Sequence, residues 1–265
     1  MSLSLRELQL VSIREGMKRT DGIAGDAIAA LGLLTRLPLP GRASHRGAEA
    51  AWAWPLAGLT VALLAAVLVG IGGWIGLPVT LCAGLLIVAM VVMTGALHED
   101  GLADVADGFW GGFTTERRLE IMKDSRIGSY GVIALVLSLG LRWQAVAVLI
   151  AGGAWIGPVL AAAMLSRAPM VVLLQEMPNA RGAGLSQAVG RPGRAAAATG
   201  MLVTLGLSLL LAGPGAVWVA LAVALAAFGV ARVAQAKVGG QTGDVLGATQ
   251  QVSEAVALCA FAALA

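Results

Sequence analysis

The sequence predicts an all-α fold: a polytopic integral membrane helical bundle of about seven spans, with a further short helix near the N-terminus. Hydrophobic residues make up 58% of the 265-residue chain and charged residues only 12%, and the mean hydropathy is +0.85. Soluble domains are about half apolar and about a quarter charged. Because a backbone in lipid must satisfy its own hydrogen bonds, helices are the expected spanning elements.

The predicted spans are the stretches that are long and apolar enough to cross a bilayer. Short turns rich in glycine and proline, or longer charged segments, separate them. In chain order they are approximately Pro55–Gly76, Val79–Ala96, Val132–Ile150, Trp155–Leu174, Ala195–Leu211, Val217–Val233 and Val252 to the C-terminus.

The apolar stretch from Gly22 to Leu37 is short and carries Asp26 and Arg36. We interpret it as an interfacial or re-entrant helix, because a full crossing here would separate the basic N-terminal segment from the other charged segments. Residues 1–21 have no apolar core and are interpreted as an N-terminal cytoplasmic extension. Residues 22–265 are then a single membrane-embedded domain.

The distribution of charge predicts the topology. Nearly all Lys and Arg residues fall in the segments 1–52, 97–131, 175–194 and 234–251, whereas the turns between them carry no charge. With the first full span starting at Pro55, every charged segment lies on one side of the membrane. The positive-inside rule assigns that side to the cytoplasm, which predicts a multi-pass membrane protein.

An acidic cluster directly follows the second predicted span. Glu99, Asp100, Asp104 and Asp107 place four carboxylates within nine residues. Asp100, Asp104 and Asp107 share one face of a helix, where unpaired carboxylates would repel each other. Hard oxygen ligands at this spacing suit Mg²⁺ or Mn²⁺, whose coordination is completed by waters and substrate phosphates. The alternative is a solvated acidic helix end, which the repulsion and the membrane-boundary position disfavour.

The segment after this cluster brings positive charge back toward it. Lys123 and Arg126 flank Asp124, which is a fifth candidate carboxylate. Gly128 and Gly131 would let the backbone approach a ligand closely. A neighbouring Lys and Asp alone are a weak signal. The segment Lys123–Arg126 is a candidate for function because it occurs together with the upstream aspartates.

Other polar residues lie on the same predicted face of the membrane. His98 directly precedes the acidic cluster and is a candidate to bind metal or phosphate, or simply to make an interfacial hydrogen bond. Arg36 ends the short N-terminal helix, and Thr242 and Asp244 lie in a glycine-rich segment over residues 239–248. Both segments could bind a phosphate through backbone N–H groups, although glycine loops also serve as tight helix connections.

The charge balance narrows the class of partner. The net charge of +3 fits contact with the anionic headgroups of a lipid bilayer and with anionic substrates. The chain has no basic patch interleaved with aromatic residues and no recognised nucleic-acid-binding module, so no nucleic acid is expected as a partner. An oligomer is compatible with the sequence, which does not define the oligomeric state.

Five strings of residues together resemble the cobalamin synthase family, the adenosylcobinamide-GDP ribazoletransferases. These motifs cover most of the chain and occur in the same order as in the family. They are Thr35–Pro38, Trp54–Gly58, Thr94–Gly108, Ile121–Gly131 and Gly240–Ala248.

The resemblance implies a Mg²⁺-dependent phosphotransferase. A hydroxyl of α-ribazole or of its 5′-phosphate would attack the phosphorus nearer the cobinamide in adenosylcobinamide-GDP. The products would be GMP and adenosylcobalamin or its 5′-phosphate. Glu99, Asp100, Asp104 and Asp107 are then the expected metal ligands.

The resemblance also suggests roles for the other candidates. Asp124 is the first choice as general base, ahead of His98 and Glu99, and Lys123 and Arg126 would assist at the diphosphate. The residues expected to contact substrate are Arg36, Ser125, Gly128, Tyr130, Gly131, Thr242 and Asp244.

Two alternatives stay open at this point. The acidic pattern also resembles the aspartate motif of CDP-alcohol phosphotransferases, but the spacing and the arginine of that motif are not reproduced after Asp104. A divalent-cation transporter should carry its acidic residues within the spans, near the bilayer midplane. Here the acidic residues stand at the end of a predicted span.

Overall fold

The computed structural model describes residues 22–39 and 46–265. Apart from one isolated β-bridge, the regular structure of these residues is helical, which confirms the all-α prediction. The extension predicted for residues 1–21 lies outside the described residues. The elements are α2 (Ile23–Leu34), the 3₁₀-helix η1 (Gly47–Ala53), α3 (Trp54–Trp74), α4 (Val79–Thr94), α5 (Leu97–Gly111), α6 (Thr115–Ile121), α7 (Ser129–Ala151), α8 (Ile156–Leu165), α9 (Ala168–Glu176), α10 (Leu185–Val189), α11 (Arg194–Ala212), α12 (Ala216–Val238) and α13 (Gly243–Leu264).

Six helical segments in the described part of the chain are long and apolar enough to cross a membrane. A seventh crossing is counted if α4 and α5 are taken together. This confirms a polytopic helical membrane protein. Helix α2, with 12 residues, is among the shorter apolar helices, as expected for the Gly22–Leu37 stretch. The six segments are Gly47–Trp74, Ser129–Ala151, Ile156–Glu176, Arg194–Ala212, Ala216–Val238 and Gly243–Leu264.

The last span begins earlier than predicted. Helix α13 starts at Gly243, not at Val252, because the Thr242 side chain caps it by accepting a hydrogen bond from the Val245 N–H (3.2 Å). Polar side chains in its first half made this stretch look like a loop. In the fold Gln250 and Gln251 are buried and donate hydrogen bonds to Ser166 and Glu99, so they do not interrupt the helix.

A sharp bend separates α4 from α5. Gly95 (φ 64°) and Ala96 (φ 56°) both adopt the left-handed conformation, and the two helices meet at 88°. The Arg36 side chain lies over this bend, so that a Cβ added at Gly95 would be 2.7 Å from Arg36 Cγ. The predicted span Val79–Ala96 therefore ends at Thr94, and α5 runs off in a new direction.

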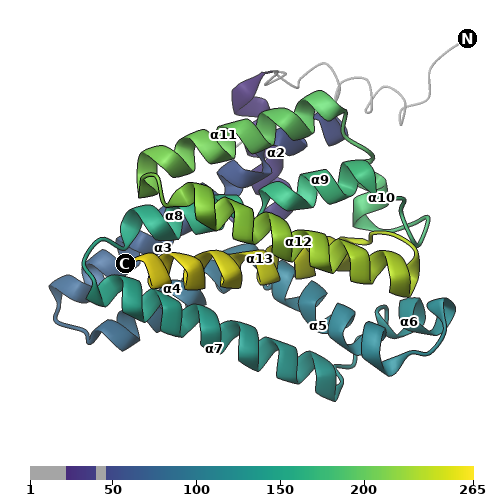
Figure 1. The fold of residues 1–265 in the computed structure, drawn as a ribbon, viewed down its shortest axis with the longest axis horizontal. Coiled ribbons are helices and arrows are strands. Elements are labelled where there is room, and N and C mark those ends of the chain that lie inside the picture. The colour runs from purple at the N-terminus through teal and green to yellow at the C-terminus, as the bar shows by residue number, and fades with distance from the viewer. Residues whose placement is uncertain (1–21, 40–45) are drawn as a thin grey trace, which may run out of the picture.

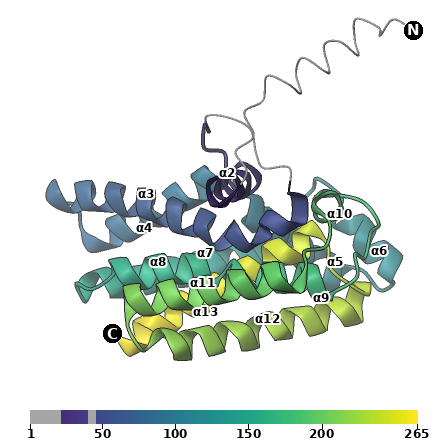
Figure 2. The same ribbon diagram turned by 90° about the horizontal axis from the view of Figure 1, so that it is seen from above.

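The charged segments gather at one end of the bundle. Figures 1 and 2 show α5, α6 and α10 at the same end, on the right of both views, together with the turn between α12 and α13. The C-terminal end of α13 lies at the other end. The segments 97–131, 175–194 and 234–251, which the charge pattern assigns to one side, are therefore neighbours in space.

A buried network of charged and amide side chains ties α5, α7 and α13 together. Arg142, which is 1% exposed, donates from Nη2 to Glu99 Oε1 (3.1 Å), and its Nη1 lies 3.6 Å from Glu254 Oε2. Gln251 donates to Glu99 Oε1 (3.0 Å), and Gln250 donates to Glu254. A charge this deep in apolar surroundings is tolerated only when it is paired, so these contacts explain the arginine in the middle of a predicted span.

We expect Arg142→Leu to destabilise the protein strongly. Removing one partner of a buried ion pair leaves an uncompensated charge, with a typical loss of about 3–5 kcal/mol. The measurement is the free energy of unfolding in a denaturing-detergent titration. Arg117→Leu is the control, because its ion pair with Glu120 is exposed and surface pairs contribute little. Equal stability of the two variants would contradict a structural role for Arg142.

Candidate active site

Helices α5 and α13 approach each other closely through glycines. A Cβ added at Gly101 would lie 2.9 Å from the Asp244 carbonyl oxygen, and one at Gly247 would lie 3.3 Å from His98 Cα. Larger residues at these positions would push the two helices apart. The contact places Asp100 and Asp104 of α5 beside Asp244 at the start of α13, and we refer to these three residues as the carboxylate cluster.

The electrostatics of Asp104 reflect this crowding. Burial, followed by the neighbouring Asp244 and Asp100 carboxylates, raises the pKa of Asp104 to about 7, and Arg181 partly opposes the shift. A positive charge placed nearby would stabilise the ionised form of this carboxyl group. The cluster therefore holds more negative charge than its surroundings compensate.

Arg181 is the cation of this site. Its Nη1 lies 2.8 Å from Asp244 Oδ2, and its side chain is 12% exposed. The Nε and Nη2 atoms are buried and have no hydrogen-bond partner within residues 22–39 and 46–265. Two further guanidinium nitrogens are thus available to an anion. The sequence indicated only that Arg181 belongs to a charged segment, because the Asp244 partner lies 63 positions away in the chain.

A short bridge between two loops positions Arg181. The Ala180 N–H donates to the Gln241 carbonyl (2.8 Å), and the Gln241 N–H donates to the Pro178 carbonyl (2.9 Å). Gly240 is required at this point, since a Cβ there would collide with the Pro178 carbonyl oxygen. The segment 178–181 and the turn before α13 are held side by side, which brings Arg181 to Asp244.

A cavity of about 150 Å³ lies next to the cluster. Its polar lining comes from His98, Asp100, Arg181, Ser186 and Asp244, and the rest of its wall includes apolar side chains of α2, α3 and α9. A concave site with a few convergent polar groups on an apolar wall is the usual form of a binding site.

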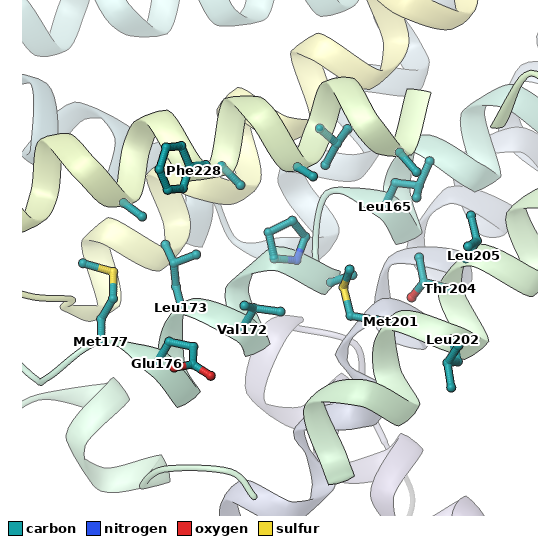
Figure 3. A pocket seen from close by; sticks show the side chains of 17 residues that line it. Leu165, Val172, Leu173, Glu176, Met177, Met201, Leu202, Thr204, Leu205 and Phe228 are labelled. Atoms are coloured by element: carbon teal, nitrogen blue, oxygen red, sulfur yellow. The ribbon is translucent and has the colours of Figure 1, made fainter. Parts of the chain in front are cut away.

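A second hollow differs in character. A groove of about 460 Å³ runs between α9, α11 and α12, and Figure 3 shows the apolar side chains that line it. Glu176, at one end near Met177, is its only titratable residue. This groove lacks the groups that could bind phosphate or metal, so the polar cavity is the candidate site.

Two residues expected at the site, Glu99 and His98, are buried, and only His98 lines the cavity. Glu99 is only 6% exposed and is bound to Arg142 and Gln251, so the structure does not bring it to the other carboxylates. His98 is 1% exposed, and its Nε2 has no partner among the described residues. Burial, then the nearby Arg167 and Arg142, lowers the pKa of His98 well below its usual value. His98 is thus neutral near pH 7.

Asp107 is engaged with the start of α7. Its carboxylate accepts hydrogen bonds from the Gly128 N–H (2.7 Å) and the Gly131 N–H (2.9 Å), a favourable place for an anion at a helix N-terminus. A Cβ at either glycine would collide with this carboxylate. Asp107, predicted as a metal ligand, and Gly128 and Gly131, predicted to contact substrate, therefore bind each other.

The residues after α6 form an exposed loop. Asp124 and Arg126 make an ion pair (2.6 Å) in which their side chains are 37% and 87% exposed. The hydrogen bonds from Arg126 lower the pKa of Asp124 to about 2, which makes Asp124 a weak base near neutral pH. Neither Asp124 nor Arg126 is among the charged residues that shift the pKa of Asp104. Lys123, Ser125 and Tyr130 are also exposed on this loop or at the start of α7.

The remaining predicted substrate contacts have local roles. Arg36 is exposed and covers the bend at Gly95. Thr242 is 1% exposed and caps α13, and its hydroxyl lies 3.4 Å from Asp244 Oδ2. Of the substrate contacts predicted from the sequence, Asp244 is the one that the structure places in the carboxylate cluster.

The carboxylate cluster supplies donors of the chemical type that Mg²⁺ prefers. Among the described residues, no group of three or more His, Cys, Asp or Glu side chains is arranged to hold a metal ion. Mg²⁺ is usually held by one or two carboxylates, with waters and substrate phosphates completing the shell. Asp100, Asp104 and Asp244 supply hard oxygen donors, and the raised pKa of Asp104 reflects a charge that a cation would offset.

Comparisons with known proteins agree with these motifs. Residues 26–262 match the family described as cobalamin-5-phosphate synthase. Proteins named adenosylcobinamide-GDP ribazoletransferase are similar to the chain. One from Bradyrhizobium diazoefficiens is 44% identical over 94% of this chain and 97% of its own length. One from Brucella anthropi is 40% identical over 90% and 96%.

A third protein of that name, from Azorhizobium caulinodans, is 44% identical over 89% of this chain and 94% of its own length. No solved structure matches. Because the family match spans most of the chain, and the relatives are aligned over nearly their whole length, the similarity covers the membrane helices as well as the site. The chain therefore belongs to the cobalamin-5-phosphate synthase family.

Proposed function

We propose that the protein transfers the cobinamide-phosphate part of adenosylcobinamide-GDP to α-ribazole or its 5′-phosphate. The observation that carries this proposal is the carboxylate cluster, whose three residues lie within the motifs that resemble the family, with Arg181 beside it. In the reaction, a hydroxyl oxygen of the acceptor bonds to the phosphorus nearer the cobinamide. The bond from that phosphorus to the bridging oxygen breaks, GMP leaves, and the hydroxyl proton is released.

Asp100, Asp104 and Asp244 are the residues that would hold Mg²⁺ or Mn²⁺. The cation, when bound, offsets diphosphate charge and stabilises the leaving phosphate. Arg181 donates hydrogen bonds to phosphate oxygens from the Nε and Nη2 atoms that the protein itself leaves without partners. Charge-assisted bonds of this kind both bind and orient a phosphate.

The exposed loop plays a supporting part in this proposal. Lys123 and Arg126 are exposed and could approach the nucleotide from solvent, and the Arg126 guanidinium is paired with Asp124. The assignment of Asp124 as general base is a separate hypothesis, and its low pKa weighs against it.

We also propose that this site faces the cytoplasm of a bacterium from its inner membrane, since the charged segments share one end of the bundle. In a version without Cys82 and Cys259, Ser125→Cys and Ala183→Cys should react with a membrane-impermeant thiol reagent only from the cytoplasmic side. Pro214→Cys, in the uncharged turn between α11 and α12, should react only from the other side. Reaction of Ser125→Cys from outside would overturn the assignment.

The activity is tested with purified protein, adenosylcobinamide-GDP and α-ribazole or its 5′-phosphate, by following GMP release with and without Mg²⁺. We expect Asp100→Asn and Asp104→Asn to lower turnover at least about 10³-fold, because each removes a charged donor from the metal site. Asp124→Asn should lower it by less than about tenfold, whereas loss of a true general base costs about 10²–10⁴-fold.

Near-normal turnover of both Asp100→Asn and Asp104→Asn at saturating Mg²⁺ would refute the metal site. A large defect in Asp124→Asn that leaves substrate affinity unchanged would instead identify Asp124 as the base. Release of CMP from CDP-diacylglycerol and an alcohol, with no GMP release from the corrinoid, would favour the CDP-alcohol phosphotransferase alternative.

Arg181 offers a test of charge balance that does not depend on turnover. Without Arg181 the cluster is more negative, so we expect Arg181→Gln to bind Mn²⁺ about tenfold more tightly, equivalent to about 1.4 kcal/mol, while GMP release falls. Mn²⁺ binding is measured by the electron paramagnetic resonance signal of the free ion. Arg191→Gln, which removes a nearby charge outside the cluster, is the control. Weaker Mn²⁺ binding in Arg181→Gln would contradict this arrangement.

A further inference from the structure

A further pocket, of about 230 Å³, is lined by Asn179 and Gln241 of the loop bridge. The C-terminal end of α9, the 178–181 segment, α10 and the turn before α13 form its walls. Ser186 on α10 lines both this pocket and the cavity of the cluster. We refer to it as the bridge pocket.

The bridge pocket has two chemically different walls. Leu174, Met177 and Pro178 form an apolar wall, and a methionine beside a proline suits a flat aromatic group. Gln187 and Gln241 contribute to the polar lining, where their amides can bind hydroxyl groups. The pocket therefore suits a ligand that is aromatic at one end and rich in hydroxyls at the other.

Gln241 gives the strongest sign that the pocket is built for a ligand. The residue is 2% exposed, and its Oε1 has no hydrogen-bond partner in the described part of the chain. A buried acceptor without a donor is costly, and such groups are rare unless a ligand or water satisfies them. Asn179, the other half of the bridge, is by contrast fully used, since it donates to Ser186 Oγ (3.0 Å) and accepts from the Arg181 N–H (3.0 Å).

The pocket is also close to the reaction site. Gln241 precedes Asp244 by three residues, and Asn179 precedes Arg181 by two. Because an extended chain spans at most about 3.6 Å per residue, the Cα atoms of Gln241 and Asp244 lie within about 11 Å. One small molecule can thus extend from the bridge pocket toward the carboxylate cluster.

We infer that the bridge pocket binds the acceptor nucleoside, with the aromatic base on the apolar wall and the ribose hydroxyls at Gln187 and Gln241. This inference rests on the proposed function. The base of α-ribazole has no N–H donor and can lie on an apolar wall without leaving a donor unpaired, whereas the guanine of the donor substrate has several polar groups there. The acceptor fits this pocket better than the guanosine does.

Arg191, which also lines the bridge pocket, bears on whether the acceptor carries a 5′-phosphate. Its Nε and Nη2 donate to the carbonyls of Gln175 (2.5 Å) and Glu176 (3.2 Å), and its Nη1 is left to bind an anion. A fixed guanidinium recognises phosphate well. The 5′-phosphorylated nucleoside should therefore bind more tightly than free α-ribazole.

The test measures binding of α-ribazole and of its 5′-phosphate to the full-length protein in lipid nanodiscs, without donor, by equilibrium dialysis. Gln187→Trp fills the pocket from an exposed position and should raise both dissociation constants at least about tenfold, and Gln241→Leu about fivefold. Arg191→Gln should weaken only the phosphorylated form. Gln235→Leu, at an exposed glutamine of α12 outside the pocket, is the matched control and should change neither.

The same variants are then assayed for GMP release. We expect the KM for adenosylcobinamide-GDP to stay within about twofold of wild type. If Gln187→Trp and Gln241→Leu bind both acceptors like wild type while the wild type releases GMP, the pocket assignment fails and the proposed function stands. A raised KM for the donor with unchanged acceptor binding would place the guanosine there and overturn the inference. Absence of GMP release from the wild type would instead refute the proposed function.

Discussion

The arrangement of the bundle depends on the buried guanidinium of Arg142. Its charge must be matched inside apolar helices, and the match comes from Glu99 on α5 and Glu254 on α13. Both carboxylates therefore have to reach the same level of α7, which fixes how α5 and α13 lie against each other. The glycine contact through Gly101 and Gly247 lets the two helices come close enough for this to happen, and the same contact assembles the carboxylate cluster.

One helix thus uses its carboxylates for three purposes. Glu99 faces the core, whereas Asp100, about 100° further round the helix, joins Asp104 at the cluster. Asp107 turns to the N-terminus of α7 and holds it through two backbone N–H groups. The direction of each side chain follows from the position of α5 between α7 and α13. The acidic run therefore holds these helices together and also supplies two residues of the candidate site.

The sequence was sufficient for the membrane class and the approximate spans, because these depend on local hydropathy. It also predicted that the charged segments lie together, because that follows from where the charges fall in the chain. The sequence could not show which acidic residue binds which partner, because the partners are distant in the chain. Glu99 and Gln251, for example, are 152 residues apart. The pairing of Arg181 with Asp244 could not be predicted for the same reason. The start of α13 was misplaced because its buried polar residues resemble a loop until their partners are known.

The distribution of charge explains why the cluster is the place for a ligand. In the core, Arg142 and Arg167 balance Glu99 and Glu254, and Asp107 is satisfied by backbone N–H groups. At the cluster three carboxylates face the guanidinium of Arg181, and burial together with the neighbouring carboxylates raises the pKa of Asp104. Uncompensated charge is costly in a buried setting. In the proposed function, a divalent cation and a diphosphate, which together carry both signs of charge, would balance it.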